Sequence, residues 1–199
     1  MGETQAMRIV GGKHRGRELQ AGLDKRIRPT ADRTREALFN ILQHGEAFRT
    51  ASGALPQGVR VLDAFAGTGA LGLEALSRGA RHVTFIDDHP DSVKLIRLNA
   101  GLLKEIPHVT ILQRDAQMPG RAPSPCQLVL LDPPYKSDLT AAAIVALNQN
   151  GWMDEGAVVV TEIAVKDTLP VPPGFKLVDE RLYGAAKIVF LKREPTPEK

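Results

Sequence analysis

An alternation of short apolar runs with helical segments, from residue 59 onward, restricts the fold more than any other feature of the sequence. Apolar runs bounded by turn residues predict buried strands, and strands that are apolar along their whole length are typical of a parallel sheet covered on both faces. The expected strands are 59–65, 82–87, 109–113, 128–131 and 157–163, with helices at 70–78, 91–104 and 141–148. The pattern predicts a doubly wound α/β sheet that ends in an antiparallel hairpin of 176–183 and 187–192, joined near Gly184.

The length and composition are those of an ordinary globular domain. The chain has 199 residues, of which 43% are hydrophobic and 25% charged, and can bury a sizeable core. Its single cysteine, Cys126, cannot form an intramolecular disulfide. The sequence has no signal-peptide pattern and no apolar run near the roughly 20 residues that span a bilayer. We therefore expect a soluble, cytoplasmic protein that does not associate with membranes.

Positive charge is concentrated near the N-terminus. Residues 8–35 contain nine basic and three acidic side chains, a net charge of +6, whereas residues 36–199 carry −2. A basic N-terminal segment on an otherwise nearly neutral chain is typical of a segment that binds a polyanion. The alternative is that these basic residues only form a solvated surface. We expect a basic, RNA-facing N-terminal extension at 1–50, an α/β domain at 51–194 and a disordered tail at 195–199.

The extension is expected to contain a hairpin followed by a helix. Glycines separate two short segments, 7–11 and 17–20, which predicts a hairpin with basic residues at its tip. Pro29 then introduces a helix that has Thr30 or Asp32 as its N-cap and continues to about residue 43. Arginines in the first turns of a helix oppose its dipole, so a functional reason for them is favoured.

A glycine motif follows the first strand of the expected sheet. Gly67, Gly69 and Gly72 stand in the sequence GTGALG, where the lack of a Cβ permits a sharp turn and the close approach of a ligand. Asp87 ends the next strand, where a carboxylate can accept both hydroxyls of a ribose. The motif predicts a nucleoside-containing cofactor, and a tight turn with an acidic residue nearby by chance is the alternative.

Two further carboxylates favour S-adenosylmethionine over NAD or FAD. Asp63 precedes the glycines, so its charge would oppose a pyrophosphate but suit the ammonium of a methionine moiety. Asp115 follows the third strand and is placed to accept a hydrogen bond from the adenine amine; a solvent-facing loop aspartate is the alternative. The predicted cofactor is therefore S-adenosylmethionine.

The most specific motif is Asp132, Pro133, Pro134 and Tyr135, directly after the apolar run 128–131. The prolines lack N–H groups and hold carbonyl oxygens in fixed directions at the carboxyl end of the sheet. A purine amine is a poor nucleophile because its lone pair is delocalised into the ring. Hydrogen bonds from its protons to Asp132 and the Pro133 carbonyl would direct the lone pair toward a methyl donor, while Tyr135 would stack on a flipped-out base. A proline-rich turn with a surface tyrosine is the alternative.

These motifs resemble those of a known enzyme family. DPPY at 132–135 is similar to motif IV of amino-methyltransferases, and VLDAFAGTGALGLEALSRGA at 61–80 is similar to their motif I. MRIVGGKHRGREL at 7–19 and RPTADRTREALFNIL at 28–42 resemble the bacterial RsmD family. The resemblance implies a Rossmann-like class I methyltransferase sheet with a small basic hairpin and helix at its N-terminus. It also implies S-adenosylmethionine-dependent methylation of the N2 amine of a guanine in 16S ribosomal RNA.

The resemblance assigns residues to three roles. The catalytic residues would be Asp132, Pro133, Pro134 and Tyr135. The cofactor would be bound by Asp63, Phe65, Gly67, Thr68, Gly69, Asp87, Asp88, Asp115 and Ala116. The RNA would be bound by Arg8, Lys13, His14, Arg15, Arg17, Arg28, Thr30, Arg33 and Arg35. The partner would be 16S ribosomal RNA within a small-subunit assembly particle, and the enzyme would be a monomer.

Two positions depart from the family pattern. His14 stands where the family commonly has tryptophan, which weakens a stacking role for the hairpin tip, and Asp87 replaces the more usual glutamate. Three other hypotheses stay open: a DNA adenine-N6 methyltransferase, a ribosome-assembly factor without activity, and an NAD oxidoreductase. No metal site is expected, because the histidines and Cys126 lack metal-ligand spacing.

Overall fold

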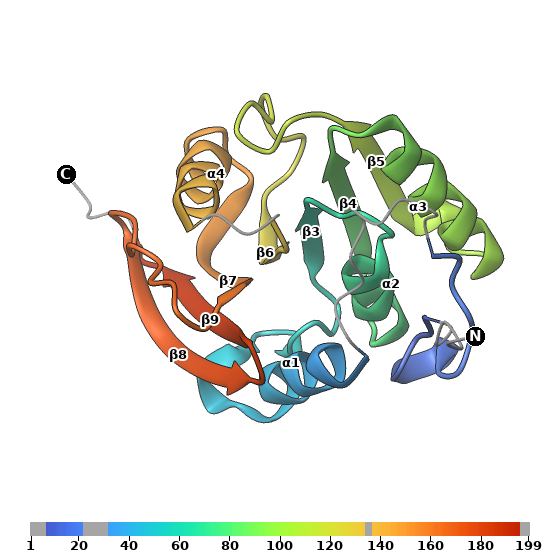
Figure 1. Cartoon of the computed structure of the whole chain (residues 1–199), viewed down its shortest axis with the longest axis horizontal. Coiled ribbons are helices and arrows are strands. Elements are labelled where there is room, and N and C mark those ends of the chain that lie inside the picture. The colour runs from blue at the N-terminus through green and yellow to red at the C-terminus, as the bar shows by residue number, and fades with distance from the viewer. Residues whose placement is uncertain (1–6, 22–31, 134–136, 196–199) are drawn as a thin grey trace.

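A seven-stranded sheet forms the centre of the molecule, and helices cover both of its faces (Figure 1). The computed structural model describes residues 7–21, 32–133 and 137–195. The strand order is β5-β4-β3-β6-β7-β9-β8. The strands are β3 (Arg60–Ala64), β4 (His82–Asp87), β5 (Val109–Gln113), β6 (Cys126–Leu131), β7 (Met153–Ala164), β8 (Phe175–Tyr183) and β9 (Ala186–Arg193).

The helices of the described ranges divide unequally between the two faces of the sheet. They are α1 (Asp32–His44), α2 (Ala70–Ser77), α3 (Pro90–Leu102) and α4 (Ser137–Gln149). Side chains of α1, α2 and α3 share one hydrophobic core with the face that includes Leu130, whereas α4 packs on the opposite face, which includes Leu131. The short elements are η1 (Gly12–His14), η2 (Glu46–Phe48), η3 (Ile106–His108), β1 (Arg49–Thr50) and β2 (Gly53–Ala54). In these parts of the chain no helix has the length and apolarity needed to cross a membrane.

The connectivity of the sheet confirms the predicted doubly wound fold. Strands β3 to β7 run parallel to their neighbours, and β9 pairs antiparallel with both β7 and β8, which is the predicted terminal hairpin. The chain moves outward from β3 to β5 and then returns to form β6 on the other side of β3. In folds of this kind ligands bind outside the carboxyl ends of the strands at such a reversal. A ligand site is therefore expected at the carboxyl ends of β3 and β6.

Three elements begin two or more residues earlier than the sequence predicts. β6 starts at Cys126, α4 starts at Ser137 and β7 starts at Met153. In β7 the apolar run is interrupted by Gly156. The pairing of β7 with β6 nevertheless continues on both sides of this glycine, and the register between the two strands shifts near Cys126. Periodicity alone does not identify a strand that continues through such an interruption.

The predicted N-terminal hairpin is only partly formed. It has a single antiparallel bridge between Arg8 and Glu18, and η1 forms its tip. Gly12 has a φ of 74°, and a Cβ at this position would lie 1.9 Å from the carbonyl oxygen of Ser77, at the end of α2. The tip is therefore packed against α2 and does not project freely into solvent.

The N-terminal extension shares its core with the sheet. Met7, Ile9, Leu38 and Phe39 are buried in the cluster that contains one face of the sheet. The boundary predicted between residues 50 and 51 stays a prediction. Thr30 lies outside the described residues, as does the tail predicted to be disordered, except for its first residue.

Candidate active site

A tight loop between β3 and α2 forms the first part of the site. The backbone φ angles in this loop are 58° at Phe65, 54° at Gly67 and 78° at Gly69. Such angles are easy for glycine and uncommon for phenylalanine. Gly72 has a different role, because a Cβ there would lie 2.4 Å from Cε1 of Phe85 in β4. Gly67 and Gly69 thus form the turn, and Gly72 allows α2 to approach the sheet closely.

Two carboxylates at the ends of neighbouring strands hold this loop. Asp63 of β3 is buried and accepts a hydrogen bond from the backbone N–H of Gly72 at 2.8 Å. Asp87 of β4 accepts hydrogen bonds from the N–H groups of Gly67 at 2.8 Å and His89 at 3.0 Å. The predicted ammonium-binding and ribose-binding carboxylates therefore lie on either side of the glycine loop.

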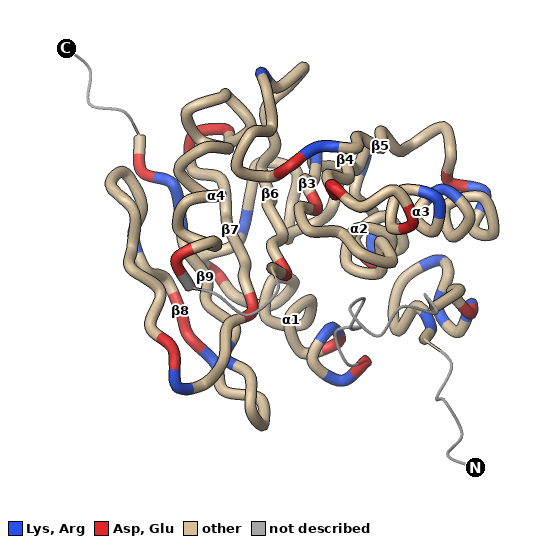
Figure 2. Tube along the Cα trace, turned by 45° about the horizontal axis from the view of Figure 1, so that its top comes forward, with Lys and Arg blue, Asp and Glu red and all other residues tan. Residues whose placement is uncertain are grey.

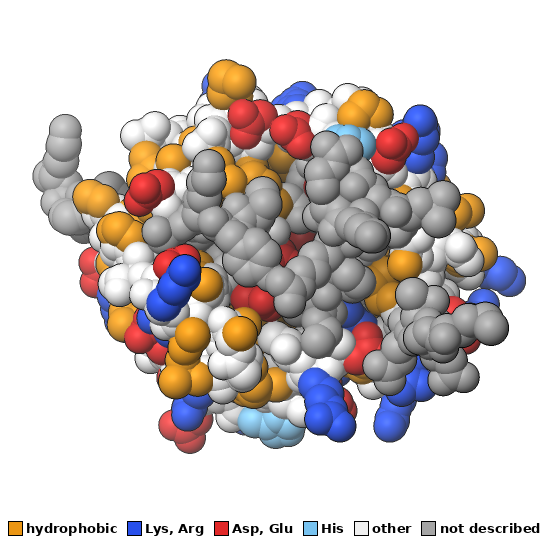
Figure 3. Space-filling view, in the orientation of Figure 1, with side chains coloured by type: hydrophobic (Ala, Val, Ile, Leu, Met, Phe, Trp, Pro, Cys, Tyr) orange, Lys and Arg blue, Asp and Glu red, His pale blue; other side chains and the backbone are white. Residues whose placement is uncertain are grey.

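Negative charge accumulates at this edge of the sheet. Burial raises the pKa of Asp63 well above its ordinary value of 3.8; the Gly72 N–H lowers it, and the nearby charges of Asp132 and Asp87 raise it further. Acidic side chains are visible at the centre of the face shown in Figure 3. Such a cluster opposes the pyrophosphate of NAD or FAD and favours a cationic ligand. The ammonium and sulfonium groups of S-adenosylmethionine fit these residues.

Asp132 and Pro133 follow β6 at the same edge. The N–H of Asp132 donates a 3.5 Å hydrogen bond to the carbonyl oxygen of Ala64, the last residue of β3. The start of the predicted catalytic motif is therefore adjacent to the glycine loop. Pro133 is buried and Asp132 is half-buried. The other two residues of the motif, Pro134 and Tyr135, lie outside the described residues.

The remaining predicted cofactor residues stand near the ends of β3, β4 and β5. Thr68 is buried beside the loop, and its hydroxyl donates to Sδ of Met7 at 3.5 Å. Asp88 is exposed and follows β4. Asp115 follows β5, two strands away from β3, and accepts a hydrogen bond from the N–H of Gln117 at 2.8 Å. Ala116 is buried beside it. Within the described ranges no group of three His, Cys, Asp or Glu side chains could hold a metal ion.

Those predicted RNA-binding residues that the structure describes lie in the N-terminal segment and in α1, where Figure 2 shows lysine and arginine positions in blue. The exposed ones are Arg8, Lys13, Arg15, Arg17 and Arg33. The hairpin tip, which carries Lys13 and Arg15, lies at the C-terminal end of α2, because the N–H of His14 donates to Oγ of Ser77 at 2.9 Å. The glycine loop precedes the opposite end of α2. Arg28 and Thr30 lie outside the described residues.

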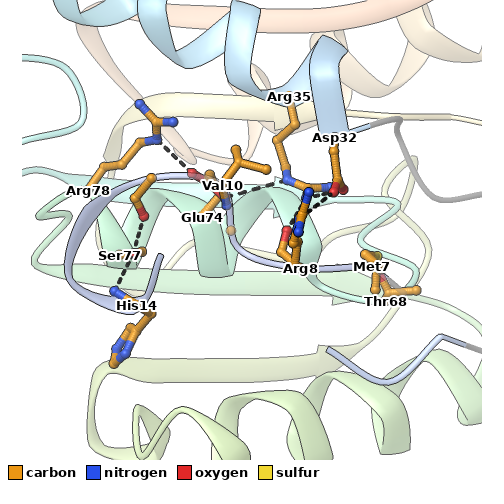
Figure 4. A network of polar contacts seen from close by, with 12 residues as sticks. Met7, Arg8, Val10, His14, Asp32, Arg35, Thr68, Glu74, Ser77 and Arg78 are labelled. Carbon is orange, nitrogen blue, oxygen red and sulfur yellow. Dashed lines mark hydrogen bonds and ion pairs between the residues drawn. The ribbon is translucent and has the colours of Figure 1, made fainter. Parts of the chain in front are cut away.

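The predicted RNA contact is wrong for Arg35, which is fully buried. Its guanidinium pairs with Asp32 at 2.8 Å and with Glu74 at 3.5 Å, and it donates to the carbonyl oxygen of Arg8 (Figure 4). A buried guanidinium needs such partners, since an unpaired charge is very costly in the interior. Arg35 therefore joins α1 and the N-terminal segment to α2.

Glu74 is the centre of this contact, and none of the sequence motifs identified it. Its carboxylate is fully buried and accepts hydrogen bonds from Nε of Arg78 at 2.7 Å and from the N–H of Val10 at 2.9 Å (Figure 4). The available signal was a glutamate in the middle of the apolar helix ALGLEALS. We name Glu74, Arg35, Arg78 and Asp32 the Glu74 cluster.

The ring of His14 contacts another acid instead of projecting toward solvent. Its Nε2 lies 2.5 Å from Oε1 of Glu105, and Nζ of Lys13 lies 2.6 Å from the same oxygen. Burial by itself would raise the pKa of Glu105, but hydrogen bonds and charges from His14 and Lys13 outweigh it and lower the pKa. His14 thus anchors the hairpin tip to the end of α3. Its predicted contact with RNA stays a prediction.

The fold and the edge carboxylates together define a class I methyltransferase, whose methyl donor is S-adenosylmethionine. The chain belongs to the family described as conserved hypothetical protein 95, whose model matches residues 7–192. This match confirms the assignment to the RsmD family.

Curated relatives and a solved structure agree with this membership. The chain is 35% identical over 194 residues to ribosomal RNA small subunit methyltransferase D of Escherichia coli, covering 96% of this chain and 92% of the relative. It is 31% identical over 183 residues to the protein of the same name from Haemophilus influenzae, with 89% of each chain covered. The solved structure of yhhF from Escherichia coli superposes with a TM-score of 0.80 at 31% identity, covering 96% of this chain and 99% of that one.

Proposed function

We propose that the protein methylates the exocyclic N2 amine of a guanine in 16S ribosomal RNA, of the guanine 966 type, with S-adenosylmethionine as methyl donor. The observation that carries the proposal is the position of Asp132 and Pro133 beside the glycine loop, at the point where the strand order reverses. This position brings an acceptor for an amine next to the carboxylates that suit a cationic cofactor. The names of the relatives support ribosomal RNA as the substrate.

The chain's own residues would prepare the amine for reaction. When bound, S-adenosylmethionine supplies an electrophilic methyl group on a sulfonium. Asp132 would accept a hydrogen bond from one amine proton and the Pro133 carbonyl from the other, which directs the nitrogen lone pair away from the ring. Orientation and exclusion of water then account for most of the rate enhancement. No strong base is needed, because the amine becomes far more acidic once it is methylated, and Asp132 can take the proton.

The exposed basic residues of the N-terminal segment and α1 would bind the phosphates of the RNA. Arg8, Arg15, Arg17 and Arg33 are exposed, and Arg33 lies at the start of α1. Phosphate contacts fix the register of a nucleic acid but carry no sequence information. We infer that these phosphate contacts present one nucleotide of a small-subunit assembly particle to the active site. We further infer that the enzyme is a monomer and acts in the cytoplasm.

The test is the transfer of labelled methyl from S-adenosylmethionine to small-subunit particles and to naked ribosomal RNA, both from a strain that lacks this gene. Mass spectrometry of the nucleosides identifies the product. N2-methylguanosine is the expected product, and particles are the expected acceptor. N6-methyladenosine would contradict the guanine assignment, and no transfer to either acceptor would leave an assembly factor without activity as the better reading.

A further inference from the structure

A second carboxylate lies beside Asp132, and the mechanism above does not use it. In the parallel ladder of β6 and β7, Leu131 is paired with Thr161, so Asp132 and Glu162 are the next residues of the two strands. Neighbouring strands are about 4.8 Å apart, and side chains two residues apart point to the same face. Leu130 and Val160 both face the core under α1 and α2. Asp132 and Glu162 therefore project toward that same side.

A small cavity confirms that the two side chains share one space. Asp132 and Glu162 both line it, and Oε2 of Glu162 is buried. The walls are apolar and come from both helices and strands: Leu38 of α1, Leu71 of α2, Leu130 and Val160. Two carboxylates side by side can accept hydrogen bonds from neighbouring N–H donors of one flat ring.

The Watson–Crick edge of guanine has this arrangement of donors. Guanine presents two protons on N2 and one on the adjacent N1, whereas adenine has an acceptor nitrogen next to its amine. If Asp132 and the Pro133 carbonyl accept the two N2 protons, the N1 proton needs a third acceptor. We propose that Glu162 accepts the N1–H of the target guanine and thereby selects guanine over adenine; this inference rests on the proposed function. Opposite adenine, the carboxylate would meet a lone pair, which is a repulsive contact.

The first experiment replaces the target guanine with 2-aminopurine, which keeps the 2-amine but has an acceptor at N1. Initial rates are measured on RNA in the form that accepts methyl groups from the wild-type enzyme. We expect the wild type to prefer guanine by about 100-fold or more in kcat/KM, because a site built to bind an N–H rejects an analogue without it. Equal rates on the two bases would overturn the inference without any variant.

The second experiment changes the acceptor to a donor. The Glu162→Gln variant can donate from its amide to the N1 of 2-aminopurine but loses the charge that attracts the N1–H of guanine. We expect its preference for guanine over 2-aminopurine to fall by about tenfold or more relative to wild type. The variant loses the hydrogen bond between a charged group and the N1–H of guanine, and it gains an amide hydrogen bond to the N1 of 2-aminopurine. The change in preference is the readout, because a merely structural role would lower both rates by the same factor.

Glu155→Gln is the matched control, since Glu155 is an exposed residue of the same strand. It should leave the preference unchanged. Parallel losses on both bases in Glu162→Gln would overturn the role of Glu162. If the wild type fails to methylate guanine at all, the proposed function fails instead, so the two failures are distinguishable. If Glu162→Gln does not fold, equal wild-type rates on the two bases still overturn the inference.

Discussion

Asp63 and Glu74 are buried carboxylates with opposite surroundings. At the carboxyl edge of the sheet, Asp63 contacts a backbone N–H and lies near two further acids, Asp87 and Asp132. In the Glu74 cluster, the buried carboxylate pairs with two arginines, Arg35 and Arg78. The comparison separates a ligand-binding site from a structural contact. At the edge of the sheet, negative charge is concentrated where a cationic ligand can compensate it. In the Glu74 cluster, arginine side chains already compensate the negative charge.

The largest expected effect is the loss of Glu74. In Glu74→Ala, Arg35 and Arg78 remain in or near the core without their shared partner. Breaking a buried pair in this way costs about 3–5 kcal/mol, because it leaves an uncompensated charge. Urea denaturation of the purified protein measures the free energy of unfolding. Glu155→Ala, which removes an exposed glutamate, is the control and should change it by less than about 0.5 kcal/mol.

The second effect concerns Asp63 and has the opposite sign for stability. The pKa of Asp63 is raised in the folded state, so the folded protein holds the proton of this carboxyl more tightly than the unfolded chain does. Ionisation of Asp63 above its ordinary pKa of 3.8 therefore reduces the stability of the folded protein. Asp63→Asn keeps an acceptor for Gly72 and removes that charge. We expect a higher Tm at pH 7 without cofactor, and about tenfold weaker S-adenosylmethionine binding by calorimetry.

An unchanged affinity for S-adenosylmethionine in Asp63→Asn would contradict the account of the acidic edge. A lower Tm at pH 7 would show that the charge of Asp63 is compensated within the protein, as the charge of Glu74 is. Either result would remove the contrast between the two regions.

A smaller effect is expected at Glu105, the acid that anchors the hairpin tip. Its pKa is lowered, so its contribution to stability is complete above its ordinary pKa of 4.5 and is lost as the pH falls through the lower pKa of the folded state. Glu105→Gln should reduce the free energy of unfolding by about 1 kcal/mol at pH 7. The difference from wild type should shrink as the pH falls below 4.5. A difference that does not change with pH would show that the ion pairs with His14 and Lys13 contribute nothing.

The smallest effect is expected for single arginines on the surface. Arg33→Ala should weaken RNA binding and reduce the slope of log affinity against log salt by about 0.7, the value for one phosphate contact on a single strand. Arg15→Ala should have less effect, because Arg15 is at the hairpin tip, at the end of α2 away from the glycine loop. Filter binding over a range of salt concentrations compares the two. A larger effect for Arg15 would place the RNA along α2 instead.

The edge of the sheet was largely predictable from the sequence, and the Glu74 cluster was not. Asp63, Gly67 and Asp87 follow from local patterns, because apolar runs define the strands and the acids stand at their ends. The contact of Arg35 with Glu74 joins residues far apart in the chain, and a charged residue read by itself suggests an exposed surface. The family resemblance therefore assigned Arg35 to the RNA, although it is buried.

Glu162 shows the same limit at the site itself. It stands in the part of β7 that was predicted as a strand, but its neighbour Asp132 is identified only by the pairing register of β6 and β7. Periodicity gives the face of a strand and says nothing about which residue lies beside it on the next strand. The residues of DPPY beyond Pro133 stay predictions, since the described residues do not include them.

The most direct test of the central claim is the Asp132→Asn variant, assayed for methyl transfer and for S-adenosylmethionine binding in the same preparation. The amide preserves the shape of the side chain but removes the charge that binds the guanine amine. The account predicts a loss of about 10²–10³ in the single-turnover rate, the usual cost of removing one aligned electrostatic contact from a transition state, with cofactor affinity within about threefold of wild type. Transfer at the wild-type rate would contradict the role of Asp132 and with it the proposed chemistry of this edge.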